Sequence, residues 1–196
     1  MDNEIQRTLV VLKPDAIQRN LAGEIISRFE RVGLKIIAMK LFVPSKEFAR
    51  KHYAPTEEEY TNIGQRSING KLKKGVECTD DPTELGHRII DGLVNFLNSG
   101  PVIAMVLEGG VAVKIVRKMV GSTEPLQSDM GTIRGDFTLD SYELADSSNR
   151  AVRNLVHASD SPETAKREIA QWFSEDEIFP YTNSRDIALY STELKY

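Results

Sequence analysis

The sequence predicts a mixed α/β (α+β) protein: a ferredoxin-like, split βαβ sheet with helices packed on it, in a single domain with surface insertions. Short apolar β-rich runs alternate with segments of helical period in the order β-α-β-α-β-α-β. The 196 residues are enough for one domain with a proper core, whereas two full domains would be cramped. The pattern leaves the order of the strands in the sheet open.

The first part of the chain is predicted to supply two strands and two helices. Apolar runs indicate strands at 8–12 and 34–43, and a one-sided apolar stripe indicates a helix over 23–32. Ser45 is typical of the N-cap of a helix that ends near Tyr53.

Two polar stretches, at about 55–88 and 138–150, have no sustained apolar period and are predicted to be surface insertions. The first is expected to contain little helix. We expect it to form either a lid or a solvated protrusion, because long loops are of both kinds. Either insertion would alter subunit packing.

The second part of the chain repeats the alternation of strands and helices. Ser161 followed by Pro162 is a capping signal for the last helix. The predicted elements are a helix over 89–97, a strand over 102–107, a helix over 111–120, an irregular loop over 121–136, a strand over 151–156 and a helix from 161 to 173; the tail from Ser174 has little pattern.

Composition predicts a cytoplasmic protein that coats neither nucleic acid nor membrane. The formal net charge is −4, which argues against a nucleic-acid-coating protein but allows a local basic pocket. Cys78 is the only cysteine, so a reducing compartment is expected. The acidic start of the chain predicts no signal peptide, and no apolar stretch is long enough to span a bilayer.

His157 is the first candidate for chemistry, because it directly follows the last predicted strand. A ring nitrogen can attack as a nucleophile, although position alone favours a structural histidine. Glu168, on the helix that follows, is placed to accept a hydrogen bond from one ring nitrogen and so fix the tautomer. The alternative for Glu168 is an exposed helix carboxylate.

Several cations and neutral donors are of the types that bind phosphate. Each basic residue alone is more often solvated, but an arginine fork and a lysine point charge together suit a phosphate group. These candidates are Lys13, Arg117 and Arg134, with Thr123, Asn154 and the Tyr53 hydroxyl as neutral donors. The chain has neither a GxxxxGK nor a GxGxxG loop, and His52 and His87 lack the spacing of a zinc site.

In this order, these residues resemble the nucleoside diphosphate kinase family. The N-x-x-H-x-S-D signature at 154–160 is specific, and several co-linear blocks accompany it over nearly the whole chain except the two insertions. The other blocks lie at 7–15, 23–26, 52–53, 99–102, 121–125 and 131–137.

The resemblance implies an activity, a cofactor and a role for each matching residue. The family transfers the γ-phosphate of a nucleoside triphosphate to a nucleoside diphosphate by a ping-pong mechanism, through a phosphohistidine and with Mg²⁺. A homo-oligomer, hexamer or tetramer, is implied as well. His157 would be phosphorylated and Glu168 would orient it; Tyr53 and Ser159 would support the site; Lys13, Arg117, Thr123 and Arg134 would hold phosphates; and Asn154 with Lys13 would reach the sugar hydroxyls.

The sequence departs from the family pattern near the nucleophile and at the base. Ala16 and Ala158 stand where the family commonly has glycine. Ile89 aligns with the base-stacking phenylalanine, and Leu93 is its apolar neighbour. Either Ile89 or Tyr60 would then contact the base. These departures motivate an alternative function, a nucleotide-binding or interaction module of the same family with weak or lost transferase activity.

Overall fold

The structure is a computed structural model that describes residues 5–53 and 56–191. These residues form two compact units. The sheet unit comprises residues 5–42, 102–141 and 153–191, and the helical unit comprises residues 43–53, 56–101 and 142–152. Residues 1–4, where the chain starts with an acidic stretch, and Pro55, where the first insertion is predicted to begin, lie outside the described residues.

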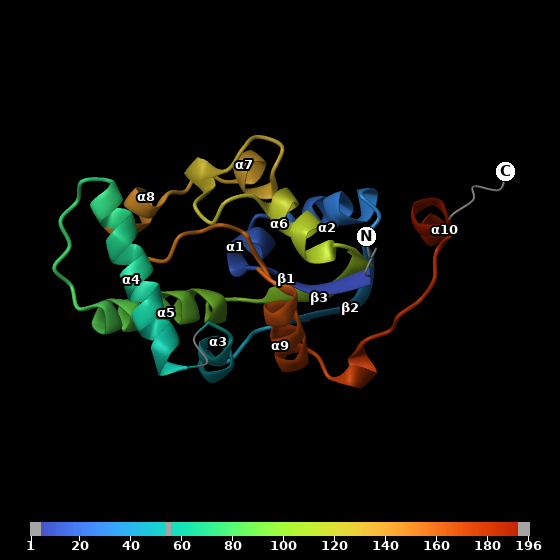
Figure 1. Ribbon diagram of the computed structural model, residues 1–196, viewed down its shortest axis with the longest axis horizontal. Helices are drawn as coiled ribbons and strands as arrows, with labels where there is room; N and C mark the ends of the chain where they lie inside the picture. The colour runs from blue at the N-terminus through green and yellow to red at the C-terminus, as the bar shows by residue number, and fades with distance from the viewer. Residues whose placement is uncertain (1–4, 54–55, 192–196) are drawn as a thin grey trace. The chain divides into compact units, whose positions relative to one another are not determined.

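The sheet unit is built on four antiparallel strands (Figure 1). The pairing order is β2-β3-β1-β4, so β1 is bonded on both sides. Residues 9–12 of β1 are at most 1% exposed, which explains the continuous apolar run that predicts this strand. The ferredoxin-like prediction is confirmed. The strands are β1 (Ile5–Leu12), β2 (Lys35–Phe42), β3 (Val102–Gly110) and β4 (Val156–Ala158).

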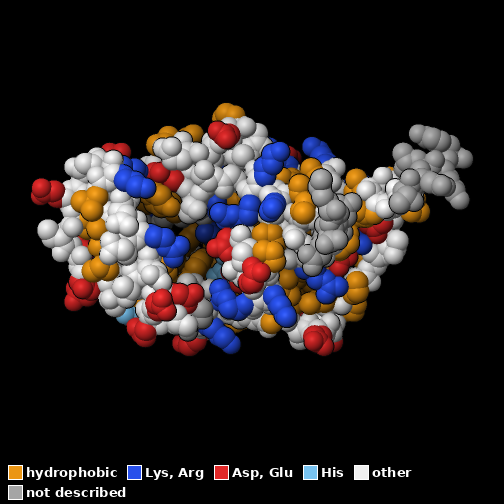
Figure 2. All heavy atoms as spheres, viewed as in Figure 1, with side chains coloured by type: hydrophobic (Ala, Val, Ile, Leu, Met, Phe, Trp, Pro, Cys, Tyr) orange, Lys and Arg blue, Asp and Glu red, His pale blue; other side chains and the backbone are white. Residues whose placement is uncertain are grey.

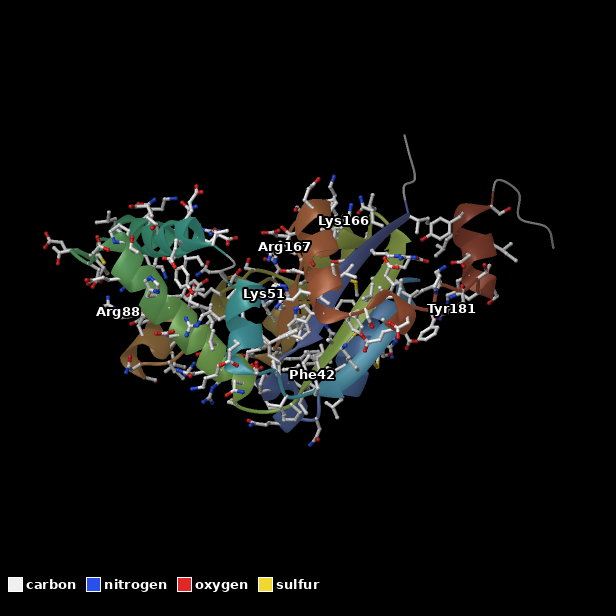
Figure 3. The ribbon with its side chains drawn as sticks, turned by 90° about the horizontal axis from the view of Figure 1, so that it is seen from below. Phe42, Lys51, Arg88, Lys166, Arg167 and Tyr181 are labelled. Carbon is white, nitrogen blue, oxygen red and sulfur yellow. The ribbon has the colours of Figure 1, made fainter. Side chains whose placement is uncertain are left out.

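Helices cover both faces of this sheet. Figures 1 and 3 show α2 and α6 on one side and α9 on the other. Ile25 and Phe29 of α2 and Val116 of α6 join the strands in one apolar core. On the α9 side, Trp172 meets the ring of Phe42 edge-on, with centroids 5.6 Å apart. Phe42 is labelled in Figure 3. The helices of this unit are α1 (Pro14–Gln18), α2 (Ala22–Arg31), α6 (Ala112–Val120), α7 (Ile133–Phe137), α9 (Pro162–Trp172) and α10 (Ser184–Tyr190), with short 3-10 turns at Pro125–Gln127 and Glu175–Glu177.

The tail is ordered against the sheet unit, although its sequence has little pattern. The Phe179 N–H donates to the Ile37 carbonyl at 2.8 Å, beside the β2 edge. The Tyr190 hydroxyl accepts the Gly110 N–H at 2.8 Å. Lys35 pairs with Asp186 at 3.0 Å and with Glu108 at 3.1 Å. Polar contacts therefore hold the tail against the sheet unit, which explains why apolar periodicity in the sequence does not predict its structure.

The helical unit contains α3 (Lys46–Tyr53), α4 (Glu57–Lys73), α5 (Pro82–Asn98) and α8 (Tyr142–Ser147). Helices α4 and α5 pack closely where each has a glycine. A Cβ at Gly64 would lie 1.8 Å from the Pro82 carbonyl oxygen, and one at Gly86 would lie 1.9 Å from that of Tyr60. Only hydrogen side chains permit this backbone approach.

The prediction of an irregular first insertion with little helix is wrong. The stretch holds all of the 17-residue α4 and the first turns of α5. Because only Tyr60, Gly64 and Ile68 of α4 are buried, its apolar stripe is too narrow to stand out in the sequence. The two ends of α4 do carry recognisable helix signals in the sequence. These are a Thr56–Glu59 capping box, three glutamates in the first turn and two lysines in the last.

Three later predictions also need correction. The stretch 121–136 is not wholly irregular, because α7 begins inside it after the Thr132 cap, and 138–150 contains α8. The last strand is Val156–Ala158 rather than 151–156. Leu155 has φ +64°, a left-handed conformation that interrupts an extended strand. As a result His157 lies within β4 instead of after it.

The surface carries both signs of charge. Figure 2 shows acidic and basic side chains interspersed over one face, in keeping with a small net charge of −4. Among the described residues, no helix is both long and apolar enough to cross a membrane.

Candidate active site

His157 is held on the short strand β4, opposite Val11 of the central strand β1. Its side chain is 21% exposed, so part of the imidazole ring is accessible to solvent and the rest is covered by the protein. Nε2 lies 3.1 and 3.0 Å from the two oxygens of Glu168. The sequence predicts this pairing, and the structure brings the two side chains together.

Glu168 is a buried carboxylate, not the exposed helix glutamate that was the alternative. It is 3% exposed and accepts the Ser159 hydroxyl at 2.6 Å in addition to the contact with His157. Helix α9 starts as predicted, with the Ser161 hydroxyl accepting the Thr164 N–H and Pro162 in the first turn. Ser159 is fixed to β1 through the Leu9 N–H, which donates to its hydroxyl at 3.3 Å. The carboxylate is thus held from α9, β4 and β1 together.

A strained turn precedes β4. The Val156 N–H donates to the Asn154 carbonyl at 2.7 Å around Leu155, which forms a three-residue γ-turn with a left-handed central residue. Backbone strain of this kind is common where side chains must be aimed at a reaction. Here the turn separates Asn154 from His157.

Lys13 lies directly after β1 and is almost fully buried, at 5% exposed. Its Nζ donates to the Asn154 side-chain oxygen at 2.7 Å, and the Asn154 amide donates to the Thr123 carbonyl at 2.7 Å. Burial, and next the charge of Arg134, lower the pKa of Lys13 to about 7, while Asp15 opposes both. The predicted donors Lys13, Asn154 and Thr123 therefore form one connected group, with the Thr123 side chain itself exposed.

Arg134 is buried and its guanidinium is directed at peptide carbonyls. It donates to Asn154 at 3.0 Å and Val156 at 2.5 Å, on the two sides of Leu155, and to Gly121 and Ser122 at 3.1 and 2.9 Å. The sequence does not predict this bracing of the backbone. Arg117, in the last turn of α6, reaches the Ala158 carbonyl at 3.4 Å. Both predicted arginines thus touch the backbone beside His157.

The other predicted site residues belong to the helical unit. Tyr53 ends α3, and Ile89 and Leu93 lie one turn apart on α5; all three are half-buried. The i, i+4 spacing puts Ile89 and Leu93 on one face of their helix, as an apolar pair requires.

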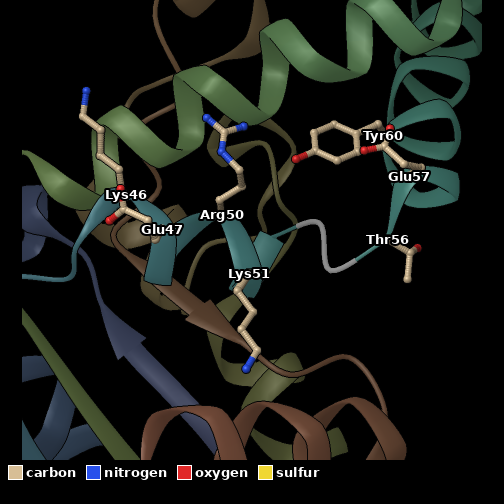
Figure 4. Close-up of a pocket in the computed structure, with 7 residues that line it drawn as sticks. All are labelled: Lys46, Glu47, Arg50, Lys51, Thr56, Glu57 and Tyr60. Carbon is tan, nitrogen blue, oxygen red and sulfur yellow. The ribbon is translucent and has the colours of Figure 1, made fainter.

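Tyr60, the other candidate for a base contact, lines a hollow of about 600 Å³ between α3 and α4. Figure 4 shows its hydroxyl directed towards the Arg50 guanidinium. The ring itself is buried and stacks on His87 with centroids 4.0 Å apart. One face of Tyr60 is therefore already covered by an aromatic neighbour.

The structure accounts for the two alanines that depart from the family pattern. Ala158 and Ala16 are both buried members of the apolar core. Ala158 pairs with Val10 in the β1–β4 ladder, an extended conformation that accepts a Cβ. A methyl group beside His157 is therefore compatible with the strand.

Asp15 is a site residue that the sequence reasoning missed. Its carboxylate accepts the Leu155 N–H at 3.0 Å and the Ala16 N–H at 3.1 Å, and it is 7% exposed. An acidic residue three positions beyond the buried end of a strand is the available signal, because a buried carboxylate needs partners.

The comparisons with known proteins agree with this geometry. The family model described as nucleoside diphosphate kinase matches residues 6–64 and 84–178. A nucleoside diphosphate kinase of Pyrobaculum aerophilum is 48% identical over 179 residues, which cover 89% of this chain and 98% of that protein.

Two solved structures are also similar. An NDP kinase from Pyrobaculum aerophilum superposes with a TM-score of 0.85 at 46% identity, covering 90% of this chain and all of that one. A nucleoside-diphosphate kinase from Borrelia burgdorferi, solved as a transition-state mimic with vanadate and ADP, has a TM-score of 0.78 at 34% identity and covers 94% and 96% of the two chains. The chain belongs to the nucleoside diphosphate kinase family and is a phosphotransferase that acts on nucleoside di- and triphosphates.

Proposed function

We propose that this phosphotransferase works by a ping-pong mechanism in which His157 carries the phosphoryl group. The contact of His157 Nε2 with both oxygens of Glu168 is the observation that supports the proposal most strongly. A carboxylate accepts only, so Nε2 carries the proton and the lone pair is on Nδ1. Nδ1 is therefore the attacking atom.

In the first half-reaction Nδ1 forms a bond to the γ-phosphorus while the bond to the bridging oxygen breaks. The leaving nucleoside diphosphate takes the electron pair of that bond. The ring gains positive character, which the Glu168 carboxylate offsets through the Nε2–H contact. In the second half-reaction a terminal oxygen of another nucleoside diphosphate attacks the same phosphorus and restores the neutral ring.

The cations hold the phosphates during both half-reactions. Lys13, Arg117 and Thr123 contact the phosphate chain, and Asn154 with Lys13 contacts the sugar hydroxyls. Arg134 acts mainly by its charge and by holding the turn beside His157, because its N–H groups already serve four carbonyls. In the helical unit Tyr53 supports the reacting site, and Ile89 and Leu93 offer apolar contact to the base.

Mg²⁺ enters as part of the nucleotide substrate. In the sheet unit, the buried carboxylates of Asp15 and Glu168 accept hydrogen bonds from the chain itself. The cations proposed to hold the phosphates, Lys13, Arg117 and Arg134, would suit a metal that takes its ligands from phosphate oxygens and water. No residue of this chain is assigned as its ligand.

We also propose that residues 1–196 form one nucleoside diphosphate kinase domain, because the family match runs through both units and breaks only at 65–83. That break lies inside the first predicted insertion, at 55–88. The second insertion, at 138–150, stays a proposal. A homo-oligomer, hexamer or tetramer, and a cytoplasmic location are further proposals, testable by light scattering and by cell fractionation.

Initial-rate kinetics test the mechanism. With ATP and dTDP varied in the presence of Mg²⁺, parallel double-reciprocal lines are expected, because the first product leaves before the second substrate binds. His157→Ala is expected to reduce kcat by about 10⁴-fold or more. Intersecting lines, or a fully active His157→Ala protein, would contradict the phosphohistidine route. Binding without turnover by the wild-type protein would favour the alternative of a nucleotide-binding module.

A further inference from the structure

The γ-turn at Leu155 is clamped by the segment that follows β1. The Lys13 N–H donates to the Leu155 carbonyl at 2.8 Å, and the Leu155 N–H donates to Asp15 Oδ2 at 3.0 Å. Both polar groups of the strained residue are thus held by residues 13 and 15. Because the turn lies between Asn154 and His157, whatever holds Leu155 also sets the positions of these two side chains.

The same carboxylate is a negative charge that acts on the buried ammonium group of Lys13. Lys13 follows β1 and Asp15 lies in the first turn of α1, with Pro14 between them. Arg134 faces Lys13 from α7, and the neutral Asn154 amide faces it from the turn before β4. On β4 itself, the titratable His157 stands opposite Val11, two residues before Lys13.

These neighbours act in opposite directions on Lys13. Burial and the positive charge of Arg134 lower its pKa to about 7, and the negative charge of Asp15 raises it. A lysine poised near neutral pH loses its charge over a small change in its surroundings. Asp15 is therefore placed to decide whether the phosphate-binding lysine is charged at working pH.

The geometry points to Asp15 as a positioning residue with two tasks: its carboxylate holds the Leu155 turn that aims His157, and its charge keeps the buried Lys13 protonated. This inference rests on the proposed function for its effect on phosphoryl transfer. Asp15 acts through Leu155 and Lys13, because its buried carboxylate accepts the N–H groups of Leu155 and Ala16.

Two variants separate the two tasks. Asp15→Asn keeps an oxygen that accepts the Leu155 N–H but removes the charge, whereas Asp15→Ala removes both. Asp140→Asn is the matched control. Asp140 is equally buried, at 6% exposed, and accepts the Arg153 N–H at 2.6 Å in the same unit, but it is not among the largest influences on the Lys13 pKa.

The first measurement is the titration of Lys13 by NMR in protein labelled at the lysine side chains, with Lys13→Met to assign the signal. We expect Asp15→Asn to lower the Lys13 midpoint by about one pH unit, as loss of a single close charge does. We expect Asp140→Asn to leave the midpoint in place. An unchanged midpoint in Asp15→Asn, or an equal shift in Asp140→Asn, would overturn the inference.

The second measurement is the pH profile of kcat/KM, which reports groups of the free enzyme. For Asp15→Asn the ratio of activity at pH 8 to that at pH 6 is expected to fall about fivefold below the wild-type ratio. Asp15→Ala should in addition lower kcat at both pH values, because the turn is released. Equal losses at both pH values in Asp15→Asn would refute the charge role. A wild-type protein without turnover would refute the proposed function, while the NMR titration would still test Asp15.

Discussion

Replacing Lys13 with methionine is expected to stabilise the fold at low pH while it removes transferase activity. Methionine keeps an unbranched apolar stem in the site that Lys13 fills, and it removes the ammonium group. The fold holds the Lys13 pKa at about 7, well below the usual 10.5. The folded state therefore disfavours the positive charge of Lys13, although the binding of phosphates needs that charge. Keeping the lysine for function lowers the free energy of unfolding.

The sign and size follow from proton linkage. Between pH 7 and 10.5 the unfolded chain binds the lysine proton more strongly than the folded protein, so wild-type stability rises with pH in that window. Below pH 7 the full destabilisation is present, because Lys13 is then charged in both the folded and the unfolded state. A drop from 10.5 to about 7 corresponds to about 5 kcal/mol at most. Loss of the hydrogen bond to Asn154 offsets about 1–3 kcal/mol of the gain.

Urea unfolding of both proteins at several pH values measures this. At pH 6 the variant is expected to be more stable by about 2–4 kcal/mol, as the balance of these two terms. Between pH 7 and 9 its advantage should shrink by about 1.4 kcal/mol per pH unit. Lys114→Met, at an exposed lysine on α6, should show neither effect. A difference between Lys13→Met and wild type that does not vary with pH would refute the reasoning.

Two further predictions concern Glu168 and the helical unit. Glu168→Gln should lower kcat roughly 10- to 100-fold at little change in KM, because the Glu168 carboxylate offsets a positive charge that His157 gains only during transfer, and a charge-assisted hydrogen bond contributes about 1.5–3 kcal/mol. An unchanged kcat in stopped-flow assays would contradict this. Gly64→Ala should cost about 1–3 kcal/mol in thermal unfolding, because its Cβ meets the Pro82 carbonyl. Gly70→Ala, on the same helix with open space around it, should stabilise by about 0.5–1 kcal/mol instead, and equal effects of the two would count against the close packing.

The sequence predicts the sheet unit well where burial is continuous. Strand β1 and helices α2 and α9 follow from apolar runs and from the Ser161–Pro162 cap. The pairing of His157 with Glu168 also follows, because a short loop joins their two elements. The order of the strands does not follow, since it depends on long-range pairing that no local pattern records.

Other features escape sequence reasoning for physical reasons. Helix α4 buries so narrow a stripe that only its capping signals reveal it. The left-handed Leu155 is imposed by Asp15 and Lys13, which lie about 140 positions earlier in the chain. The sequence predicts Arg134 as a phosphate-binding cation, yet its guanidinium donates to backbone carbonyls that only the fold brings together. Because the residues that hold Leu155 are distant in the chain, the sequence around Leu155 does not predict its left-handed conformation.

The central claim, phosphoryl transfer through His157, is tested most directly by isolating the phosphorylated protein. Incubation with γ-labelled ATP and Mg²⁺ should give an acid-labile phosphoprotein whose label GDP removes as labelled GTP. His87→Gln, at a half-buried histidine of the helical unit, should be labelled like the wild type, and His157→Ala should carry no label. A wild-type protein that transfers phosphate without ever becoming labelled, or equal labelling of His157→Ala, would contradict the account.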